Sequence, residues 1–486
     1  MIGLVCIIAV YIGLSSYLHT INPPIWPDEA IYANVAENII STGQVKLDLW
    51  SDTVLHVDSK AMWNTPMFFY DVAVWQKIWG LSISYQRLLP EIVGLLIIVV
   101  ITLLLLQDRN SRKPDIGIIL LVLGLWVSNI LISKSTRMAR PDIFSLFFGL
   151  VGIYAAVKSF TKNDKRIIYS IVSGVSYGCA VLHHFIGVFF MIGYIITYII
   201  QRKTISRKKF LVAIGAFITV ITPWLIDVCI NWTTYITQFS LSLEARKFVH
   251  SWITTDIFYA EVLVSLTIIG YIALFAYLIF LIVKKLLTEK TSISTTSLLL
   301  LITSLLYWIF SIKGKSEFYS IYPFTLTLIL TCTLIGRELK QYKKNLVIIL
   351  FAIILIQIYL YSSVIQRLYT SKNNYSAFAR EVAKHIPSHS TVYLSTVPDP
   401  YYGIVKNKTI RIYEFLAVPI SREQYTYLLS KSDYIVYNAP YNSYMFGEFV
   451  GSYIHANSES SIKVTKGGYS TDVIKLKPKN KRITDF

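Results

Sequence analysis

The sequence predicts a polytopic α-helical membrane protein that carries a small α/β domain at its C-terminal end. Of its 486 residues, 54% are hydrophobic and only 15% are charged, a composition too apolar for a soluble protein. The last long apolar run ends at about residue 363, and from about Asn373 the composition is that of a soluble domain. We therefore expect a transmembrane part over 1–368 and a separate C-terminal domain over 369–486.

The transmembrane part contains about eleven apolar segments that are long enough to cross a bilayer. The first has no basic start and no small-residue cleavage site, so we expect a retained span rather than a signal peptide. The boundary between the fifth and sixth segments depends only on His183 and His184, which interrupt one long apolar run. The segments are 1–18, 88–107, 115–133, 142–158, 167–182, 185–200, 210–230, 257–283, 293–311, 318–335 and 345–363.

The distribution of basic residues predicts how the spans are oriented. The net charge is +18, but Lys and Arg are concentrated in one set of alternate short loops, a pattern that sets membrane topology and does not indicate nucleic-acid binding. With the basic loops in the cytoplasm, the N-terminus is cytoplasmic and the C-terminal domain lies outside the plasma membrane. This alternation also supports the division at the two histidines. The four cysteines all lie in apolar segments, so no disulfide framework is expected.

The first outer loop, 19–87, begins with the most unusual stretch of the chain. Prolines at positions 23, 24 and 27 end the first helix, and Asp28 and Glu29 then begin an amphipathic helix. The two carboxylates could serve only as a helix cap. Later in the loop, 64–81 is apolar but interrupted by polar residues and rich in aromatics. That pattern favours a juxtamembrane helix lying in the membrane interface over a short extra span.

The C-terminal domain is expected to be a small α/β unit on the outer surface. An amphipathic helix is predicted over 376–386, and a second helix over 421–430 lies between two strands. Short strands are predicted at 391–395, 409–415, 433–438 and 472–477. The domain contains no Gly-rich phosphate loop and no metal-ligand spacing, so the sequence assigns it no chemistry.

Unusual ionisable residues collect on the predicted outer side of the membrane. Such groups at membrane depth are costly and are usually functional or paired, so together they indicate a site for an anionic, membrane-borne substrate. They are Asp28, Glu29, Lys134, Arg137, Arg140, Asp142, His183, His184, Glu244, Arg246, Lys247, His250, Lys313, Lys315 and Glu317.

Each of these groups also has a simpler interpretation. Arg137 and Arg140 could snorkel toward the interface or pair with Asp142. The histidine pair could be interfacial and satisfied by hydrogen bonds, and Tyr319 and Tyr322 fit an aromatic belt better than catalysis. A divalent metal stays open as a cofactor, with Asp28, Glu29 and the histidines as its ligands, although no spacing demonstrates such a site.

Five stretches, in this order, resemble the GT-C membrane glycosyltransferases of the protein O-mannosyltransferase and aminoarabinose (lipid A) transferase type. They are PDEAIYANVAENI, NTPMFFYDVAVWQKIWG, YQRLLPEIVGLL, RMARPDIFSLFF and LHHFIGVFF. The resemblance covers roughly the first two hundred residues, and the later spans match only by hydropathy. It implies transfer of a hexosyl or pentosyl group from a polyprenyl-phosphate donor to an acceptor on the outer face, with Asp28 as the catalytic carboxylate.

One departure from that family concerns the donor phosphate. Relatives often carry Lys-Pro-Pro where this chain has Asn64, Thr65 and Pro66, and the resemblance implies that this lysine contacts the phosphate. Asn64 cannot supply a charge. Lys60, Arg137 or Arg140 could compensate, or the donor could be held differently.

These residues suggest an inverting single displacement. A carboxylate beside an acceptor hydroxyl can act as general base, and an arginine can meet the charge of the leaving phosphate. Asp28 is the expected base, although local chemistry alone does not separate it from Glu29. The expected substrate-binding residues are Lys60, Asn64, Arg137, Arg140, Asp142, His183 and His184.

Two other classes of protein compete with this interpretation. A transporter or flippase of a lipid-linked or small anionic substrate would also carry ionisable residues in its spans, but the sequence shows no convincing internal repeat. A structural or binding protein that uses the C-terminal domain would leave Asp28 and the arginines unexplained. For the transferase, the expected partners are the lipid-linked donor, membrane lipid, and a protein, glycan or lipid acceptor.

Overall fold

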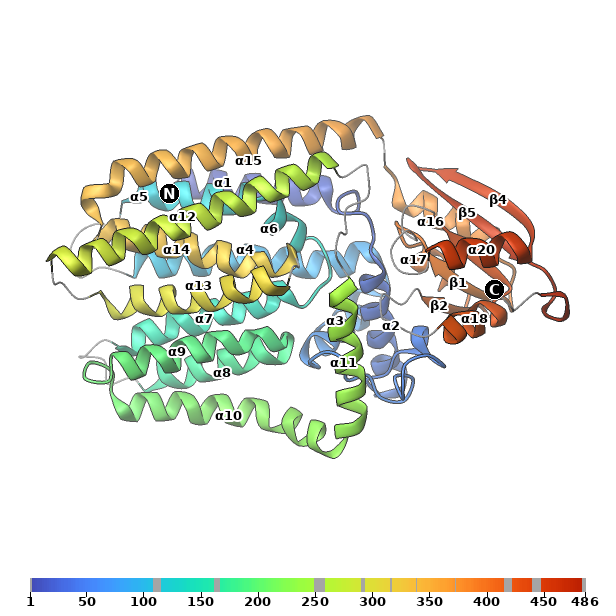
Figure 1. Ribbon diagram of the computed structural model, residues 1–486, viewed down its shortest axis with the longest axis horizontal. Helices are drawn as coiled ribbons and strands as arrows, with labels where there is room; N and C mark the ends of the chain where they lie inside the picture. The colour runs from blue at the N-terminus through green and yellow to red at the C-terminus, as the bar shows by residue number, and fades with distance from the viewer. Residues whose placement is uncertain are drawn as a thin grey trace.

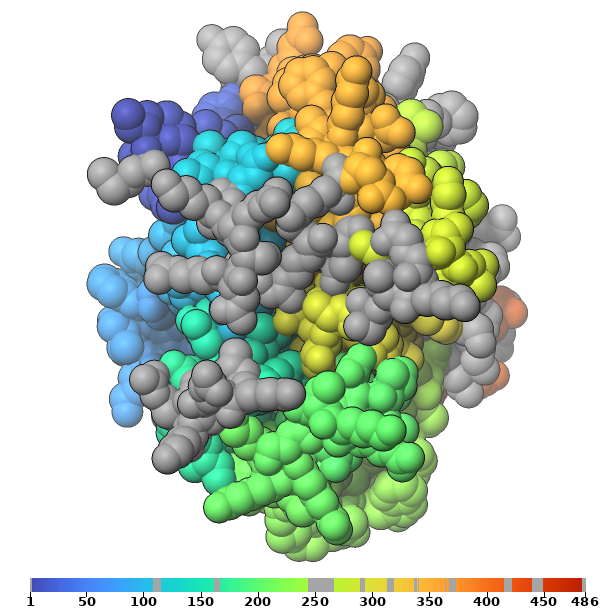
Figure 2. Space-filling model, turned by 90° about the vertical axis from the view of Figure 1, so that its left-hand side faces the viewer, coloured from blue at the N-terminus to red at the C-terminus, as the bar shows by residue number. Residues whose placement is uncertain are grey.

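The protein consists of a long bundle of helices with an α/β domain at one end, as the computed structural model shows (Figure 1). The structure describes residues 2–107, 115–160, 167–248, 258–289, 293–314, 317–337, 339–371, 373–414, 422–438 and 447–482. The chain enters the bundle at the end opposite the α/β domain (Figure 1). Figure 2 views that opposite end, where residues from the first half of the chain (blue to green) and from the second half (yellow to orange) lie side by side at the surface.

In the described part of the chain, eleven apolar helices match the eleven predicted segments one by one. Six are long and apolar enough to cross a membrane, and five are shorter apolar helices of 10–17 residues. The long ones are α4 (Ile83–Leu106), α7 (Asp142–Phe160), α10 (Arg207–Ile230), α12 (Phe258–Glu289), α13 (Thr295–Gly314) and α15 (Lys343–Ser371). The shorter ones are α1 (Ile2–Leu18), α5 (Ile116–Ser128), α8 (Ile168–His183), α9 (Val188–Ile200) and α14 (Ile321–Arg337).

The predicted break between the fifth and sixth segments is confirmed. Helix α8 ends at His183, and His184 has extended backbone angles (φ −151°, ψ 129°). A short 3-10 helix, η2 (Phe185–Gly187), then leads into α9. The third predicted segment differs, because Asn129 divides it into α5 and a short helix, α6 (Ile130–Ser135). The Asn129 side chain accepts hydrogen bonds from the first N–H groups of α6, which caps a new helix there.

Three further helices do not belong to the eleven apolar helices and lie at the end of the bundle that carries the α/β domain (Figure 1). They are α2 (Pro27–Thr42), α3 (Met67–Trp79) and α11 (Trp232–Phe248), with a 3-10 turn, η1 (Asp48–Trp50), after α2. Both α3 and α11 run across the long helices rather than along them (Figure 1). Helix α2 is the predicted amphipathic helix, but its N-cap is Trp26 rather than Asp28. It ends at Gly43, which takes a left-handed conformation (φ 74°) that glycine adopts without strain.

The C-terminal domain is the predicted α/β unit, built on a five-stranded sheet with the order β2-β1-β3-β5-β4. The first three strands, β1 (Thr391–Ser395), β2 (Arg411–Glu414) and β3 (Tyr434–Tyr437), are parallel to one another. Strand β5 (Tyr469–Leu476) runs antiparallel to both β3 and β4 (Ser458–Lys466). The helices of this domain are α16 (Tyr375–Lys384), α17 (Tyr401–Ile404), α18 (Arg422–Lys431) and α20 (Gly447–Asn457).

Strand β4 and helix α20 were not predicted. Nearly every residue of β4 is exposed or partly exposed, so the strand has no alternation of apolar and polar side chains to reveal it. It pairs with β5 through a tight turn at Gly467 and Gly468, which both have positive φ. The remaining short 3-10 turns are η4 (Glu317–Ser320), η5 (Lys340–Tyr342) and η6 (Lys479–Lys481).

Candidate active site

The loop that joins α1 to α2, residues 19–26 and here called the proline loop, is bound by two arginines, of which Arg87 makes the larger number of hydrogen bonds. Arg87, near the start of α4, is buried and donates from Nη1 to the carbonyl oxygens of His19 (3.0 Å) and Pro23 (2.8 Å). Its Nη2 lies 3.2 Å from the carbonyl oxygen of Pro24. Because prolines lack N–H groups, the loop cannot form regular internal hydrogen bonds, and the guanidinium supplies donors for its carbonyls.

Glu29 is enclosed within the protein and binds the same arginine. Arg87 donates from Nε to Oε1 (2.8 Å) and from Nη2 to Oε2 (2.6 Å) of Glu29, and neither side chain has exposed surface. The backbone N–H groups of Trp26 and Ala139 also donate to this carboxylate, at 3.1 and 3.2 Å. The structure therefore separates the two acidic residues that the sequence left equivalent, because Glu29 is closed to solvent and Asp28 is not.

Asp28 is the carboxylate that solvent can reach, and it faces Arg140. Its side chain is 34% exposed and accepts a hydrogen bond from Nη1 of Arg140. Arg140 lies just before α7 and also donates from Nε to Oδ2 of Asp142, at 3.1 Å. Burial by itself would lower the pKa of Arg140, but the carboxylates of Asp142 and Asp28 outweigh burial and raise that pKa above its ordinary value. Arg140 is therefore a fixed cation between two carboxylates.

His184 and two tyrosines surround Asp142, the buried member of this group. Nδ1 of His184 accepts a hydrogen bond from the backbone N–H of Ile186 (3.3 Å), which directs Nε2 toward Oδ1 of Asp142, 3.8 Å away. The ring of Tyr319 lies edge-on to the His184 ring, with 5.5 Å between centroids. Tyr322 donates to the backbone carbonyl of Asp142 at 2.9 Å. Tyr319, expected to belong to an aromatic belt, thus lies beside a predicted site residue.

Tyr32 connects Asn64 to the same group of charges. It lies one turn after Asp28 on α2, and its hydroxyl is 3.4 Å from Nδ2 of Asn64. Burial raises the pKa of Tyr32; the Arg140 cation opposes that rise, and the charges of Asp28 and Asp142 add to it. The phenol therefore stays neutral and can donate a hydrogen bond within the site.

His183 points away from this group, although it is adjacent to His184 in sequence. Its Nε2 lies 2.7 Å from Oδ2 of Asp71, and its Nδ1 lies 2.8 Å from the carbonyl oxygen of Cys179. The ring is stacked on Phe144 and Phe148, with centroids 5.5 and 4.9 Å apart. The two histidines diverge because the helical backbone of α8 ends between them.

Arg137 also binds the proline loop, as Arg87 does. Its side chain is 1% exposed and donates from Nε to the carbonyl oxygen of Asn22 at 2.8 Å. Its Nη1 donates to Ser133 and, at 3.1 Å, to the hydroxyl of Tyr361 on α15. Of the two arginines that the sequence singled out for the donor phosphate, Arg140 is the one beside Asp28.

Lys60 also has its own partner, since it forms an ion pair with Asp227 at the end of α10. The structure thus brings Asp28, Asn64, Arg140, Asp142 and His184 together and gives the other predicted residues different neighbours. His250 and Lys315 lie outside the described residues, as do the side chains of Glu244, Arg246, Lys247, Lys313 and Glu317.

Solved structures with the same fold are found over nearly the whole chain. ArnT from Cupriavidus metallidurans, in the apo state, has a TM-score of 0.61 and 12% sequence identity, and the match covers 97% of each chain. The same protein bound to undecaprenyl phosphate has a TM-score of 0.60, with equal identity and coverage. The chain has the GT-C fold.

The structure of a second protein has the same fold. The archaeal oligosaccharyltransferase AglB from Archaeoglobus fulgidus, in complex with an inhibitory peptide and a dolichol-phosphate, has a TM-score of 0.55 and 11% identity. That match covers 96% of this chain and 74% of AglB. No protein-family model matches the sequence, and no curated protein matches it either.

Several residues of this candidate site were not singled out from the sequence. Arg87 could have been suspected, because Gln86 and Arg87 form a polar pair at the start of an otherwise apolar segment. Tyr32 carries no such signal, since a tyrosine on an amphipathic helix is ordinary. Among the described residues there is no group of three or more His, Cys, Asp or Glu placed to hold a metal ion.

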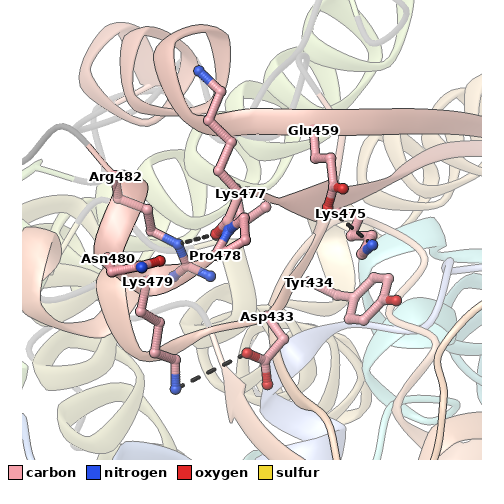
Figure 3. A pocket seen from close by; sticks show the side chains of 10 residues that line it. Asp433, Tyr434, Glu459, Lys475, Lys477, Pro478, Lys479, Asn480 and Arg482 are labelled. Carbon is pink, nitrogen blue, oxygen red and sulfur yellow. Dashed lines mark hydrogen bonds and ion pairs between the residues drawn. The ribbon is translucent and has the colours of Figure 1, made fainter.

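A hollow of about 540 Å³ on the C-terminal domain is a second place where charged side chains gather (Figure 3). Its cations are already engaged locally. Lys475 pairs with Glu459 at 2.9 Å, and Lys479 lies 3.9 Å from Asp433. Arg482 donates to backbone carbonyls that include those of Ser430 and Ser432, at 2.6 and 2.7 Å. The charges in the hollow are therefore paired with neighbouring groups of the same domain, and we assign no site there.

Proposed function

We propose that this protein transfers a sugar from a polyprenyl-phosphate-linked donor to an acceptor hydroxyl, with inversion, at the outer face of the plasma membrane. The observation that carries the proposal is the pairing of Asp28, a carboxylate open to solvent, with the fixed cation Arg140. Support comes from the shared fold of ArnT, whose structure holds undecaprenyl phosphate, and of AglB, whose structure holds a dolichol-phosphate.

In the proposed reaction, Asp28 takes the proton of the acceptor hydroxyl as its oxygen attacks the anomeric carbon. The bond from that carbon to the phosphate oxygen breaks, and the polyprenyl phosphate leaves with the bonding electron pair. A phosphate is a good leaving group if its charge is met, so no second carboxylic acid is required. Glu29, closed to solvent and bound to Arg87, would shape the site without exchanging protons with the acceptor.

We assign the leaving phosphate to Arg140 rather than Arg137. The side chain of Arg140 is partly exposed beside Asp28, whereas Arg137 is buried and directs its Nε and Nη1 donors to a carbonyl and two hydroxyls. The remaining nitrogen of Arg137, Nη2, is buried without a hydrogen-bond partner among the described residues. Asp142 and His184 would hold Arg140 in place from its buried side. Asn64 and Tyr32 would offer neutral hydrogen bonds to the sugar or phosphate where related sequences carry a lysine.

The location of the reaction follows from the charge distribution in the sequence. Helix α2, with Asp28 in its first turn, lies at the end of the bundle that carries the C-terminal domain (Figure 1). The bias of basic residues predicts that this end is outside. The acceptor would be a protein, a glycan or a lipid of the cell envelope.

The test uses purified full-length protein in nanodiscs with a panel of radiolabelled polyprenyl-phosphate sugars. Release of polyprenyl phosphate is compared between the wild type, Asp28→Asn and a matched control, Asp58→Asn. Asp58 lies in the same outer loop, is exposed and has no ion pair among the described residues. The proposal expects sugar-specific release by the wild type and the control, and a loss of about 10²–10⁴-fold in the Asp28 variant.

Three results would change the assignment. Equal release by Asp28→Asn would remove Asp28 as the base. Loss of activity on chelation with EDTA would give a divalent metal the charge-compensating role proposed for Arg140. No release from any donor, together with saturable binding or flux of a lipid-linked substrate, would favour a transporter or flippase.

A further inference from the structure

The C-terminal domain makes a buried backbone contact with the proline loop. The backbone N–H of Asp399 donates to the carbonyl oxygen of Ile25 at 3.0 Å, and both residues are fully buried. The hydroxyl of Tyr375, on α16, donates to the carbonyl oxygen of Asp399 at 2.7 Å and keeps this segment in place. The domain is thus attached directly to the loop that leads into Asp28.

Tyr402 brings the same domain to the first turn of α2. Its buried hydroxyl lies 2.7 Å from Oε1 of Gln86 and 3.0 Å from the backbone carbonyl oxygen of Glu29. Nε2 of Gln86 donates to that same carbonyl at 2.9 Å. The backbone carbonyl of Glu29 therefore accepts hydrogen bonds from Gln86 on α4 and from Tyr402 of the C-terminal domain. Tyr402 is 373 positions away in the chain.

The rim of this contact consists of exposed ion pairs. Lys408 pairs with Glu37 on α2, and Asp52 accepts hydrogen bonds from Arg411 (3.0 Å) and Lys431 (3.2 Å). Exposed pairs of this kind are each worth about 0–1 kcal/mol and mainly set the register of two surfaces. The buried hydroxyl of Tyr402 is the contact that reaches the turn itself.

We infer that Tyr402 is a positioning residue for Asp28, so that the C-terminal domain orients the proposed catalytic turn. The expected effect on catalysis rests on the proposed function. The contact between Tyr402 and Glu29 is independent of that function. Arg87 fixes the side chain of Glu29, and Gln86 and Tyr402 fix its backbone. Asp28 immediately precedes Glu29 in the same helical turn. The proline loop has few hydrogen bonds of its own, so its path depends on such external contacts.

Loss of the hydroxyl should affect turnover more than binding. A general base must lie within hydrogen-bond reach of its proton, and displacement of a catalytic group by about 1 Å can cost on the order of 100-fold in rate. The donor phosphate is assigned to Arg140, whereas the hydroxyl of Tyr402 is bound to Gln86 and the backbone of Glu29. We expect kcat to fall roughly tenfold in Tyr402→Phe, while KM for the donor changes less than about twofold.

The experiment compares full-length Tyr402→Phe with Tyr434→Phe in nanodiscs. Tyr434, in the hollow of Figure 3, belongs to the same domain, and its hydroxyl makes no hydrogen bond in the described part of the chain. Two readouts are taken on each variant. One is kcat and KM for the polyprenyl-phosphate donor, and the other is hydrogen–deuterium exchange of peptides that cover residues 21–32.

Faster exchange over 21–32 in Tyr402→Phe alone, with the fall in kcat, supports the inference. Unchanged exchange would overturn it whatever the activity, because the turn would not depend on the hydroxyl. Faster exchange with unchanged kcat in an active protein would overturn it as well. If the wild type transfers no sugar from any donor, the proposed function fails, and the exchange data still decide whether Tyr402 orders the turn.

Discussion

Glu29 and Arg87 form a two-point ion pair in which neither side chain reaches solvent. Removing two charges from water is costly, so such a pair adds little net stability, yet breaking it leaves an uncompensated charge in the interior. The remaining donors of Arg87 bind carbonyl oxygens of the proline loop. The pair therefore fixes the path of the chain immediately before Asp28, and its value lies in geometry more than in energy.

Replacement of Arg87 should destabilise the protein strongly. In Arg87→Met the Glu29 carboxylate would stay buried without its cation, which costs about 3–5 kcal/mol. Reversible unfolding in mixed micelles, followed by circular dichroism, measures the loss. The control is Lys408→Met, which breaks the exposed pair with Glu37 and should cost about 0–1 kcal/mol. Equal losses in the two variants would contradict a buried, structural role for Arg87.

Replacement of Arg140 by lysine should impair the reaction although it keeps the charge. Arg140 binds Asp28 and Asp142 with different nitrogens, and a lysine ammonium on a flexible stem cannot reproduce that planar geometry. Loss of one charge-assisted hydrogen bond is worth about 1.5–3 kcal/mol, so kcat/KM for the donor should fall about 10- to 150-fold. Steady-state kinetics with a range of donor concentrations test this. If Arg137→Lys raised the donor KM and Arg140→Lys did not, the phosphate would belong to Arg137.

Asp399 should make stability depend on pH. Burial raises its pKa to about 7 from the ordinary 3.8; a hydrogen bond from the backbone N–H of Tyr401 and one shared with the Glu414 side chain oppose this rise, and the charge of Glu29 adds to it. Between about pH 4 and pH 7 the folded protein then holds a proton that the unfolded chain has lost. Stability should therefore fall as pH rises through this window and level off above pH 7.

Asp399→Asn isolates this contribution, because the amide has nearly the same shape and does not titrate. The free energy of unfolding is measured at pH 5 and pH 8 for both proteins. The wild type should lose more stability between these pH values than the variant loses. Parallel losses would show that Asp399 titrates normally in the folded protein.

The features predicted correctly from sequence are those that depend on local composition and length. The eleven apolar segments follow from runs of apolar residues, and the turn at Asp28 follows from prolines next to carboxylates. The break was placed at His183 and His184 because they interrupt an apolar run, and the alternation of basic loops supported it. Strand β4 was missed because it is exposed and polar and exists only through its pairing with β5.

The partners of the polar residues could not be predicted, because they are distant in the chain. Glu29 binds an arginine 58 positions away, and the contact of Glu29 with Tyr402 spans 373 positions. Lys60 was a candidate for the donor phosphate and pairs with Asp227, on a helix whose position no local pattern reveals. The sequence indicates that charged residues in an apolar chain need partners. Which residues pair is determined by the packing of the helices.

The two adjacent histidines should behave differently when each is replaced by glutamine. His184 faces Asp142, which in turn holds Arg140, so His184→Gln should lower kcat/KM for the donor by roughly tenfold through a displaced cation. His183 is bound to Asp71 and stacked on two phenylalanines, so His183→Gln should mainly lower the unfolding temperature. Donor kinetics and thermal unfolding are measured on both variants. If this assignment is right, His184→Gln shows the larger loss of kcat/KM and His183→Gln the larger fall in unfolding temperature. A greater loss of activity in His183→Gln at equal stability would place His183, and with it Asp71, at the site of reaction.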